Sequence, residues 1–331
     1  MNPTRRLLTL GGLGALSLTA ACGPRASADG SRALNAVDVH PADYPTVHAV
    51  HWMGEELGRL TDGRLGVKQF PAGQLGTEDD SIGLTRFQAV DMCRVAVAAL
   101  NNAFPETRLL ALPYVFGSVE HVRAVVDGPI GTDLLNVFEG RGLVGLAYYD
   151  AAPRSVYNVR RPIHTPADMH GLKMRAPQSD IFLDTIRAMG ANPTPLTFGA
   201  VFSSLQTHLI DGAENNWPSY QSSRQFEVAR YWSETQHSFS PDALLMSKAS
   251  LDALAPGDRD LVRDVARRSV QVMRTEWDAR EAKARETVLA GGVQVNEVDK
   301  AAFAAATRPV LDKYISEPRL RALYERIAAT A

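Results

Sequence analysis

The sequence GLKMRAP at residues 171–177 and the sequence GANPTPLTFGAVFSSLQTHLIDGAENNWPSY at residues 190–220 decide the fold. In the first, apolar residues alternate with polar ones and Pro177 follows Arg175 after one residue, which predicts a short strand that runs into a turn. Ligands of open α/β sheets lie at strand ends. A guanidinium there, together with the amide side chains of IDGAENNW, is suited to hold a small carboxylate.

The chain has 331 residues, of which 45% are hydrophobic and 22% charged. This composition is typical of a soluble globular protein, and the length is sufficient for two cores. Strands are expected to alternate with helices, which indicates an α/β architecture. The expected strands are 64–70, 91–100, 143–149, 154–159, 172–176 and 293–298, and the expected helices include 47–60, 77–88, 131–140 and 258–290.

The helix expected at 258–290 contains no Gly or Pro. At a rise of ~1.5 Å per residue it would be roughly 45–50 Å long, which exceeds the width of one small domain. We therefore expect it to contact two units.

The first residues predict an export signal. Two arginines precede an apolar run from Leu7 to Ala21 that is too short for a comfortable membrane span. Both a Sec and a Tat signal fit this pattern. Cleavage after Ala21 would leave Cys22 as a lipid attachment site, although Thr19 stands where Leu is usual; the alternative cut follows Ala28. The lipoprotein cut is preferred, and either cut places the mature protein in the periplasm.

Removal of residues 1–28 takes away three arginines and no acid, so the net charge falls from −2 to −5. This charge argues against nucleic acid and anionic membranes as partners. Cys93 is then the only cysteine, which excludes an intrachain disulfide and predicts a small buried side chain. The sequence has no nucleophile elbow, P-loop, HExxH motif or metal-spaced Cys pair, so we expect no metal, no cofactor and no enzyme.

Four motifs occur in one order and are separated by characteristic spacings: Gly171–Arg175, Gly190–Pro193, Phe198–Gln206 and Asp211–Asn215. This set resembles the signature of the solute-binding subunits of tripartite ATP-independent periplasmic (TRAP) transporters. Weaker resemblance extends over nearly all of the mature protein. The segments ENNxPSY, EVARY, TQHS and PYVFGSVEHV are similar to the branch that binds hexuronates and related sugar acids.

The resemblance implies a periplasmic-binding-protein-like α/β fold with two lobes, a ligand cleft between them and a long helix that spans both. Carried over to this chain, lobe I consists of residues 31–151 plus 242–280. Lobe II consists of residues 152–241 plus 281–331. The strands that join the lobes are expected to cross more than once.

The resemblance also implies ligand-binding residues in lobe II. Arg175 matches the arginine that clamps the ligand's carboxylate, although most arginines form surface ion pairs. Arg154 matches a second arginine, with a hinge salt bridge to Asp150 as the alternative. Asn215 matches the asparagine of the pocket, and Trp217 is expected either to face the ligand or to pack the hinge.

In lobe I, Glu78 and Arg94 resemble contacts of the sugar-acid branch. The alternative for Glu78 is stabilisation of a helix start, which needs no ligand. His48, which lies with His51 on the first helix, is expected to reach a sugar hydroxyl, although exposed or core histidines are commoner.

Three positions depart from the family pattern. Ala200 and Phe202 stand where Glu and Tyr are usual, and His208 stands where Gly is common. The first two changes remove a carboxylate and a hydroxyl beside the signature, so they question the inherited ligand specificity.

The sequence therefore predicts a monomeric solute-binding protein of a TRAP transporter. It would capture a hexuronate or aldonate by hinge closure and deliver it to a membrane permease. The alternatives are a family member that binds a C4-dicarboxylate or keto acid, a ligand sensor, and an enzyme that acts on a sugar acid.

Overall fold

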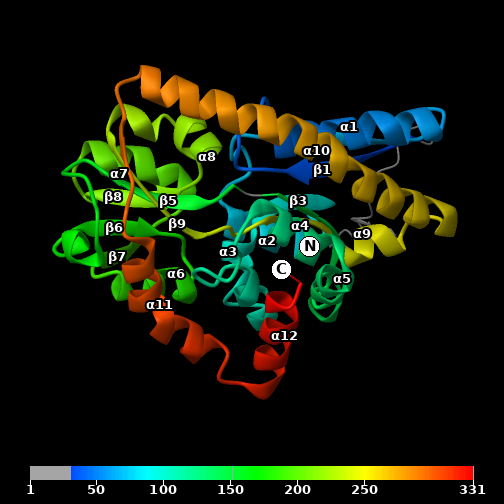
Figure 1. Ribbon diagram of the computed structural model, residues 1–331. Coiled ribbons are helices and arrows are strands. Elements are labelled where there is room, and N and C mark those ends of the chain that lie inside the picture. The colour runs from blue at the N-terminus through cyan, green and yellow to red at the C-terminus, as the bar shows by residue number, and fades with distance from the viewer. Residues whose placement is uncertain (1–30, 151, 331) are drawn as a thin grey trace, which may run out of the picture.

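The computed structural model describes residues 31–150 and 152–330, so the leader and Cys22 lie outside the described residues. The strands form two sheets, which Figure 1 shows side by side. The first sheet, in the order β2-β1-β3-β10-β4, consists of β1 (Arg32–Val37), β2 (Leu65–Phe70), β3 (Met92–Ala96), β4 (Leu143–Tyr149) and β10 (Asp242–Ser247). The second, in the order β11-β9-β5-β8-β6-β7, consists of β5 (Arg154–Asn158), β6 (Lys173–Ala176), β7 (Asn192–Pro195), β8 (Gly212–Asn215), β9 (Tyr231–Ser238) and β11 (Gln294–Asn296).

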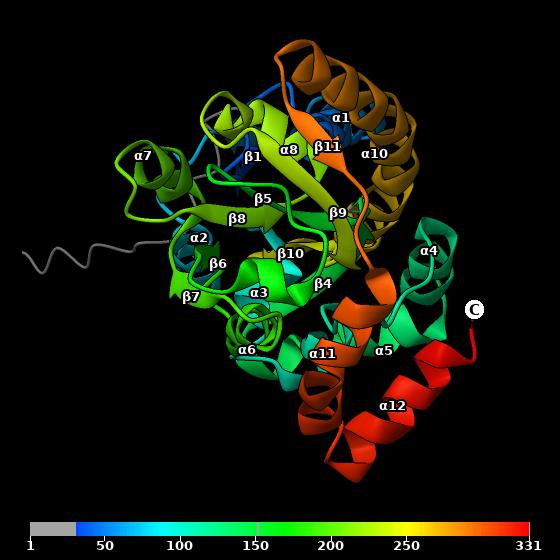
Figure 2. The same ribbon diagram turned by 60° about the vertical axis from the view of Figure 1, so that its left-hand side comes forward.

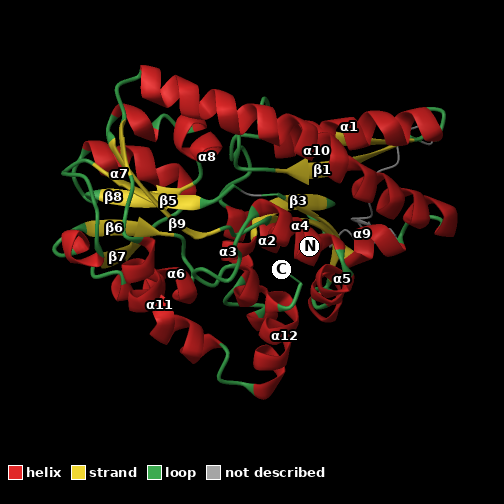
Figure 3. Ribbon diagram, in the orientation of Figure 1, coloured by secondary structure: helices red, strands yellow, loops and turns green. Residues whose placement is uncertain are grey.

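Helices cover both sheets, so each sheet is the centre of one α/β lobe (Figure 3). Around the first lie α1 (Pro45–Leu60), α2 (Glu78–Arg86), α3 (Val97–Leu100), α4 (Val119–Asp127), α5 (Pro129–Asn136) and α9 (Lys248–Asp252). Around the second lie α6 (Asp180–Ala188), α7 (Val201–Gln206), α8 (Trp217–Ser222) and α11 (Lys300–Tyr314). The predicted two-lobed α/β fold is confirmed.

Strand direction gathers the ends of several strands at one place in each lobe. In the second sheet β6 is parallel to β8, whereas β5 is antiparallel to β8 with Ser155 opposite Asn215. The end of β6, the end of β8 and the start of β5 therefore meet. In the first sheet β1 and β3 are parallel, and β10 is antiparallel to β3 with Asp242 opposite Ala96. The ends of β1 and β3 thus meet the start of β10.

The start of α2 follows from local chemistry. The Thr77 side chain accepts a hydrogen bond from the backbone N–H of Asp80, and the Asp80 carboxylate accepts one from the backbone N–H of Thr77 at 2.9 Å. This reciprocal capping box fixes the first turn, as the predicted cap at Thr77 requires. The strand predicted at 91–100 is shorter than expected, because the chain turns into α3 after Ala96.

The longest helix, α10 (Pro256–Ala290), has 35 residues and lies along both lobes (Figure 1). Its Val262 and Trp277 are buried in a core of the first lobe, whereas its Ala284 and Val288 are buried in a core of the second. The expected contact with both lobes is confirmed. Within the described residues, no helix combines the length and the apolar character needed to cross a membrane.

The last helix, α12 (Pro318–Ala328), packs against the first lobe (Figure 2). Arg326 contacts Asp133 of α5 at 3.0 Å, and the His121 ring nitrogen lies 2.9 Å from the Ile327 carbonyl oxygen. This placement differs from the expected assignment of residues 281–331 to lobe II. The apolar face of a helix indicates that the helix packs, but not on which lobe.

Gly212 of β8 allows two strands to approach closely. A Cβ atom at this position would lie 2.3 Å from the Tyr157 carbonyl oxygen and 2.7 Å from the Met174 sulfur. We predict that Gly212→Ala lowers the free energy of unfolding by roughly 3 kcal/mol, because neither strand can move away without disturbing the sheet. Urea denaturation of the variant measures this change.

Gly83→Ala provides the matched control. Gly83 lies in α2 and an added Cβ atom meets nothing within 4 Å, so this variant should be neutral or more stable by up to ~1 kcal/mol. Equal stability of Gly212→Ala and wild type would contradict the argument from close packing.

Candidate functional site

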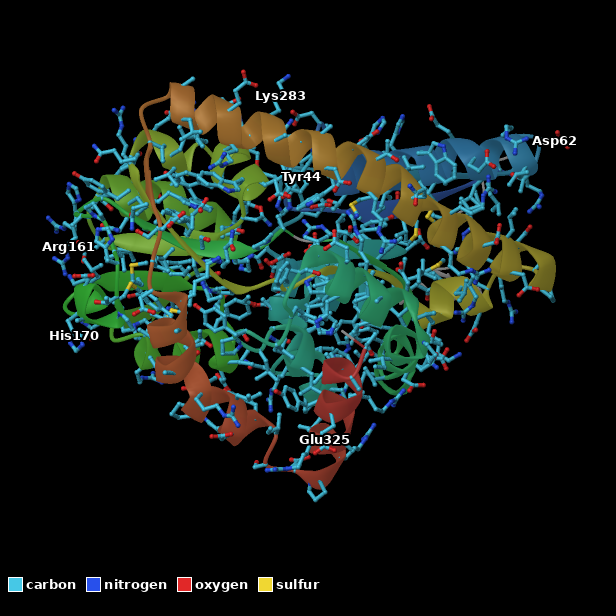
Figure 4. All side chains as sticks on the ribbon, in the orientation of Figure 1. Tyr44, Asp62, Arg161, His170, Lys283 and Glu325 are labelled. Carbon is cyan, nitrogen blue, oxygen red and sulfur yellow. The ribbon has the colours of Figure 1, made fainter. Side chains whose placement is uncertain are left out.

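A cavity of about 360 Å³ lies between the lobes, within the range of small-molecule sites. Lobe I contributes the turn before α2 and the start of α2, including Glu78. Lobe II contributes Arg175 and the segment 196–199. An inner chamber of about 50 Å³ shares Glu78 and Arg175 with the cavity. Tyr44, which also lines the chamber, marks the place where the lobes meet beneath α10 in Figure 4.

Arg175 lies near the end of β6 and is only 5% exposed. Its Nε donates a hydrogen bond to the Leu196 carbonyl oxygen at 2.9 Å. Among the described residues, no carboxylate forms an ion pair with it. Burial lowers the pKa of Arg175 below its usual value, because the surroundings do not fully replace water around the charge. Arg175 is therefore the arginine of the cavity whose positive charge is available to bind the anionic group of a ligand.

Arg154, at the start of β5, is also buried but has partners. Its Nε and Nη2 donate to the two oxygens of Glu214 at 2.6 and 2.8 Å, and its Nη1 donates to Asn215 Oδ1 at 3.0 Å. Burial raises the pKa of Glu214, but the charge and hydrogen bonds of Arg154, with His237 nearby, outweigh it and lower this pKa to about 2. Arg154 and Asn215 both line the inner chamber beside Arg175.

The alternative partner for Arg154 is wrong. Asp150 is buried and instead contacts Arg123 of α4 and Arg274 of α10. These contacts connect the end of β4 to two helices. The Arg154 guanidinium is thus oriented by Glu214 toward the chamber rather than held in a hinge pair with Asp150.

Arg94 lies below the wall of the inner chamber and is 1% exposed. Its Nε donates to Asp38 at 2.9 Å, and its Nη1 lies 3.3 Å from Glu78 and 3.4 Å from Asp242. Arg94 itself is absent from the residues that line the cavity and the chamber, whereas Glu78 and Asp242 line the chamber. The predicted contact residue Arg94 therefore lies one layer behind the surface and positions three carboxylates.

The carboxylates around Arg94 differ in their pKa. Burial would raise the pKa of Asp38, but the nearby Arg94 charge outweighs burial and holds it well below the usual range. Burial raises the pKa of Asp242 to about 6, and Arg94 offsets this effect only in part. Asp242 thus changes its charge closer to neutral pH than Asp38 does.

The position of Glu78 is compatible with both roles that the sequence left open. It is the first residue of α2, and its Oε1 accepts a hydrogen bond from the Ala96 backbone N–H at 2.8 Å. It also lines both the cavity and the chamber. Helix stabilisation and exposure to the cavity are therefore compatible.

Two predicted site residues lie elsewhere. The His48 side chain is 51% exposed and contacts Glu276 of α10, because it lies on the outer face of α1. Trp217 stacks on Trp232 with 3.8 Å between ring centroids and does not line the cavity. Trp217 therefore packs inside lobe II, which agrees with the packing alternative rather than with contact to a ligand. His48 is not part of the candidate site.

Other cavity residues escaped the sequence analysis. His40 stacks on Phe198 across the lobes, with ring centroids 5.2 Å apart, and the Tyr44 hydroxyl lies 2.9 Å from Ser219 Oγ. The Ser240 hydroxyl lines the chamber, is buried and has no hydrogen-bond partner among the described residues. Phe198 could have been found from the sequence, because it begins one of the four motifs. No sequence pattern identified His40, Tyr44, Ser219 or Ser240 as residues of the cavity.

The three departures from the family pattern lie outside this lining. Neither Ala200 nor Phe202 lines the cavity or the chamber. His208 is exposed and adopts a φ of 57°, a left-handed conformation that favours glycine. The left-handed backbone conformation thus explains why Gly is usual at this position. Cys93 is buried, as predicted, and burial raises the pKa of its thiol to about 12.

Comparison with known proteins agrees with this geometry. Residues 36–317 match the family described as bacterial extracellular solute-binding protein, family 7. A solute-binding protein of Chromohalobacter salexigens is 36% identical over 300 residues, which cover 90% of this chain and 88% of the relative. A TRAP periplasmic solute-binding protein of Bradyrhizobium, solved with galacturonate, is 49% identical with a TM-score of 0.89 and covers 90% of this chain and 100% of that one.

A Citrobacter koseri TRAP solute-binding protein, 37% identical, is known in two forms. The form with bound D-glucuronate matches with a TM-score of 0.87 over 90% of this chain and 99% of that one. The apo, open form matches with a TM-score of 0.80 over 89% and 98%. The better match to the bound form agrees with the contacts that join the lobes here. The chain belongs to family 7 of the bacterial extracellular solute-binding proteins, the solute-binding subunits of TRAP transporters.

Proposed function

We propose that this protein captures a hexuronate or a closely related sugar acid in the periplasm and delivers it to the membrane permease of a TRAP transporter. The observation that carries the proposal is Arg175: a buried guanidinium that lines a cavity between two lobes and forms no ion pair with a carboxylate of the described residues. A ligand carboxylate supplies the missing anion with the planar geometry that a guanidinium prefers.

The rest of the cavity suits a polyhydroxylated ligand. Glu78 and Asp242 offer carboxylate groups that accept hydrogen bonds from hydroxyls. The Asn215 amide oxygen already accepts from Arg154 and from the Asn216 backbone N–H, so its NH₂ group can donate to a ligand oxygen, and Phe198 offers an aromatic surface. Similar proteins solved with galacturonate and glucuronate support this ligand class. The proposal makes the protein a carrier rather than an enzyme, so the ligand should be recovered unchanged after incubation.

Binding would act through closure of the lobes. A ligand that contacts Arg175 in lobe II and Glu78 in lobe I makes its full set of contacts only when the lobes are together. It therefore shifts the population toward the closed form. We propose that a monomer in this form is what the permease recognises.

A thermal-shift screen of the exported protein tests the ligand class. The panel contains galacturonate, glucuronate, aldonates, C4-dicarboxylates, keto acids and sialic acid. A ligand present at ~100 times its Kd should stabilise the protein by ~2.7 kcal/mol. We expect the hexuronates to give the largest shift; a response to C4-dicarboxylates or keto acids alone would refute the sugar-acid proposal.

Arg175→Lys tests the clamp. The ammonium group cannot form two parallel hydrogen bonds to a carboxylate, and it cannot reach Leu196 and the ligand together. We predict that titration calorimetry shows roughly 100-fold weaker hexuronate binding, which corresponds to about 2.7 kcal/mol. Arg187→Lys, an exposed change on α6, should bind as wild type does. Wild-type affinity in Arg175→Lys would exclude it as the clamp.

Asp242→Asn tests the charge of the chamber wall through stability. The pKa of Asp242 is raised from 3.8 to about 6 in the folded protein, so the folded state binds this proton more tightly than the unfolded chain does. The resulting stability is present at low pH and is lost as the pH rises through about 6. Relative to Asp242→Asn, wild type should lose about 1 kcal/mol of unfolding free energy between about pH 5 and about pH 7.

Urea denaturation of both proteins at several pH values measures this difference. Titrating groups far from Asp242 are shared by both proteins and cancel in the comparison. A difference between wild type and Asp242→Asn that is the same at every pH would show that Asp242 has an ordinary pKa.

A further inference from the structure

The two lobes present opposite charge to the cavity. In lobe II, Arg154 is neutralised by Glu214, which leaves Arg175 as the surplus positive charge. In lobe I, one guanidinium, that of Arg94, faces three carboxylates. The cavity therefore has a positive end and a negative end, each built on a different sheet.

The negative end is a built arrangement rather than a loose surface cluster. Arg94 is fully buried and holds Asp38, Glu78 and Asp242 at once, so it has no capacity left for a ligand anion. His40 contacts Asp38, and Asp79 of the cavity and Tyr44 of the chamber are further titratable side chains on this wall. Because the guanidinium already occupies the centre of the acids, this end is not a vacant cation site.

Two groups beside this space lack partners that a bound ligand would supply. Arg175 is buried, lines both spaces and forms no ion pair with any described residue. The Ser240 hydroxyl is 2% exposed, lines the chamber and lacks a hydrogen-bond partner within the described part of the chain. Ser240 also has a φ of 44°, and strain of this kind gathers at functional sites.

We propose that Glu78 and Asp242 determine specificity by restricting the site to sugar acids with one carboxylate and rejecting the matching diacids. This inference rests on the proposed function and narrows its ligand class. The single carboxylate lies at Arg175, and the opposite end of the ligand is an uncharged group whose hydroxyls donate to Glu78 and Asp242.

Charge explains the discrimination. A hydroxyl that donates to a carboxylate forms a strong, charge-assisted hydrogen bond. A second carboxylate at the same place can only accept hydrogen bonds and meets like charges that Arg94 does not balance. Such a juxtaposition weakens binding by roughly 100-fold or more. Rejection by like charge is the repulsive part of a specific site.

D-Gluconate and D-glucarate test this inference, because both are open-chain acids that differ only in a terminal CH₂OH or carboxylate group. Each competes with bound D-glucuronate in titration calorimetry at neutral pH. We expect gluconate to compete at least about 100 times better than glucarate. In Glu78→Gln, the ratio of gluconate affinity to glucarate affinity should fall by about tenfold or more. Asp242→Asn replaces this variant if Glu78→Gln fails to fold, with the same expected fall. Glu276→Gln on α10 removes a charge outside the cavity and should keep the wild-type ratio.

The outcomes separate the two proposals. If glucuronate binds but gluconate and glucarate compete equally, the proposed function stands and the charge-based discrimination is wrong. A wild-type ratio in both cavity variants would likewise overturn it, because some other feature would then reject the diacid. Failure of every sugar acid to bind would refute the proposed function, and the inference would fall with it.

Discussion

The site depends on one constraint: the buried positive charge of Arg175 forms no ion pair within the part of its lobe that the structure describes. Removal of a guanidinium from water is unfavourable unless an anion and hydrogen bonds replace the lost hydration. Leu196 supplies one carbonyl oxygen, and burial still lowers the pKa of Arg175. The neighbouring Glu214 charge offsets burial only in part, because Arg154 holds both of its oxygens. The unfilled demand for an anion is therefore a property of the folded lobe itself.

Sheet topology brings these groups together. Arg154, Arg175 and Asn215 are up to 61 residues apart in the chain, yet parallel pairing of β6 with β8 and antiparallel pairing of β5 with β8 place them at one edge. The lobe II half of the site could be predicted from the sequence, because its residues lie in or next to a contiguous motif. Close packing explains the glycine at position 212 of the same motif, because a side chain there would collide with Tyr157.

The lobe I half could not be read in this way. Its acids come from the loop after β1, the start of α2 and the start of β10, and a single buried arginine holds them. No sequence period connects Asp38 with Asp242. The histidine of the site is His40 rather than His48, because the chamber is lined by the segment before α1 and not by its outer face. The assignment of α12 to lobe II failed for a similar reason. Helical periodicity shows that one face of a helix is buried, but not against which lobe it packs.

The distribution of charge also bears on closure. Lobes with opposite charge on facing walls attract each other, and a strong pair between Glu78 and Arg175 would close the protein without ligand. Arg94 opposes this effect, because it shares the Glu78 carboxylate from within lobe I at 3.3 Å. The attraction between the lobes is weakened, while Arg175 remains without an anion. In the proposed function, a ligand carboxylate would supply the anion that lobe I withholds, and its hydroxyls would donate to the acids that Arg94 has fixed. A ligand that contacts both lobes would therefore add to the contacts that already join them and stabilise the closed form.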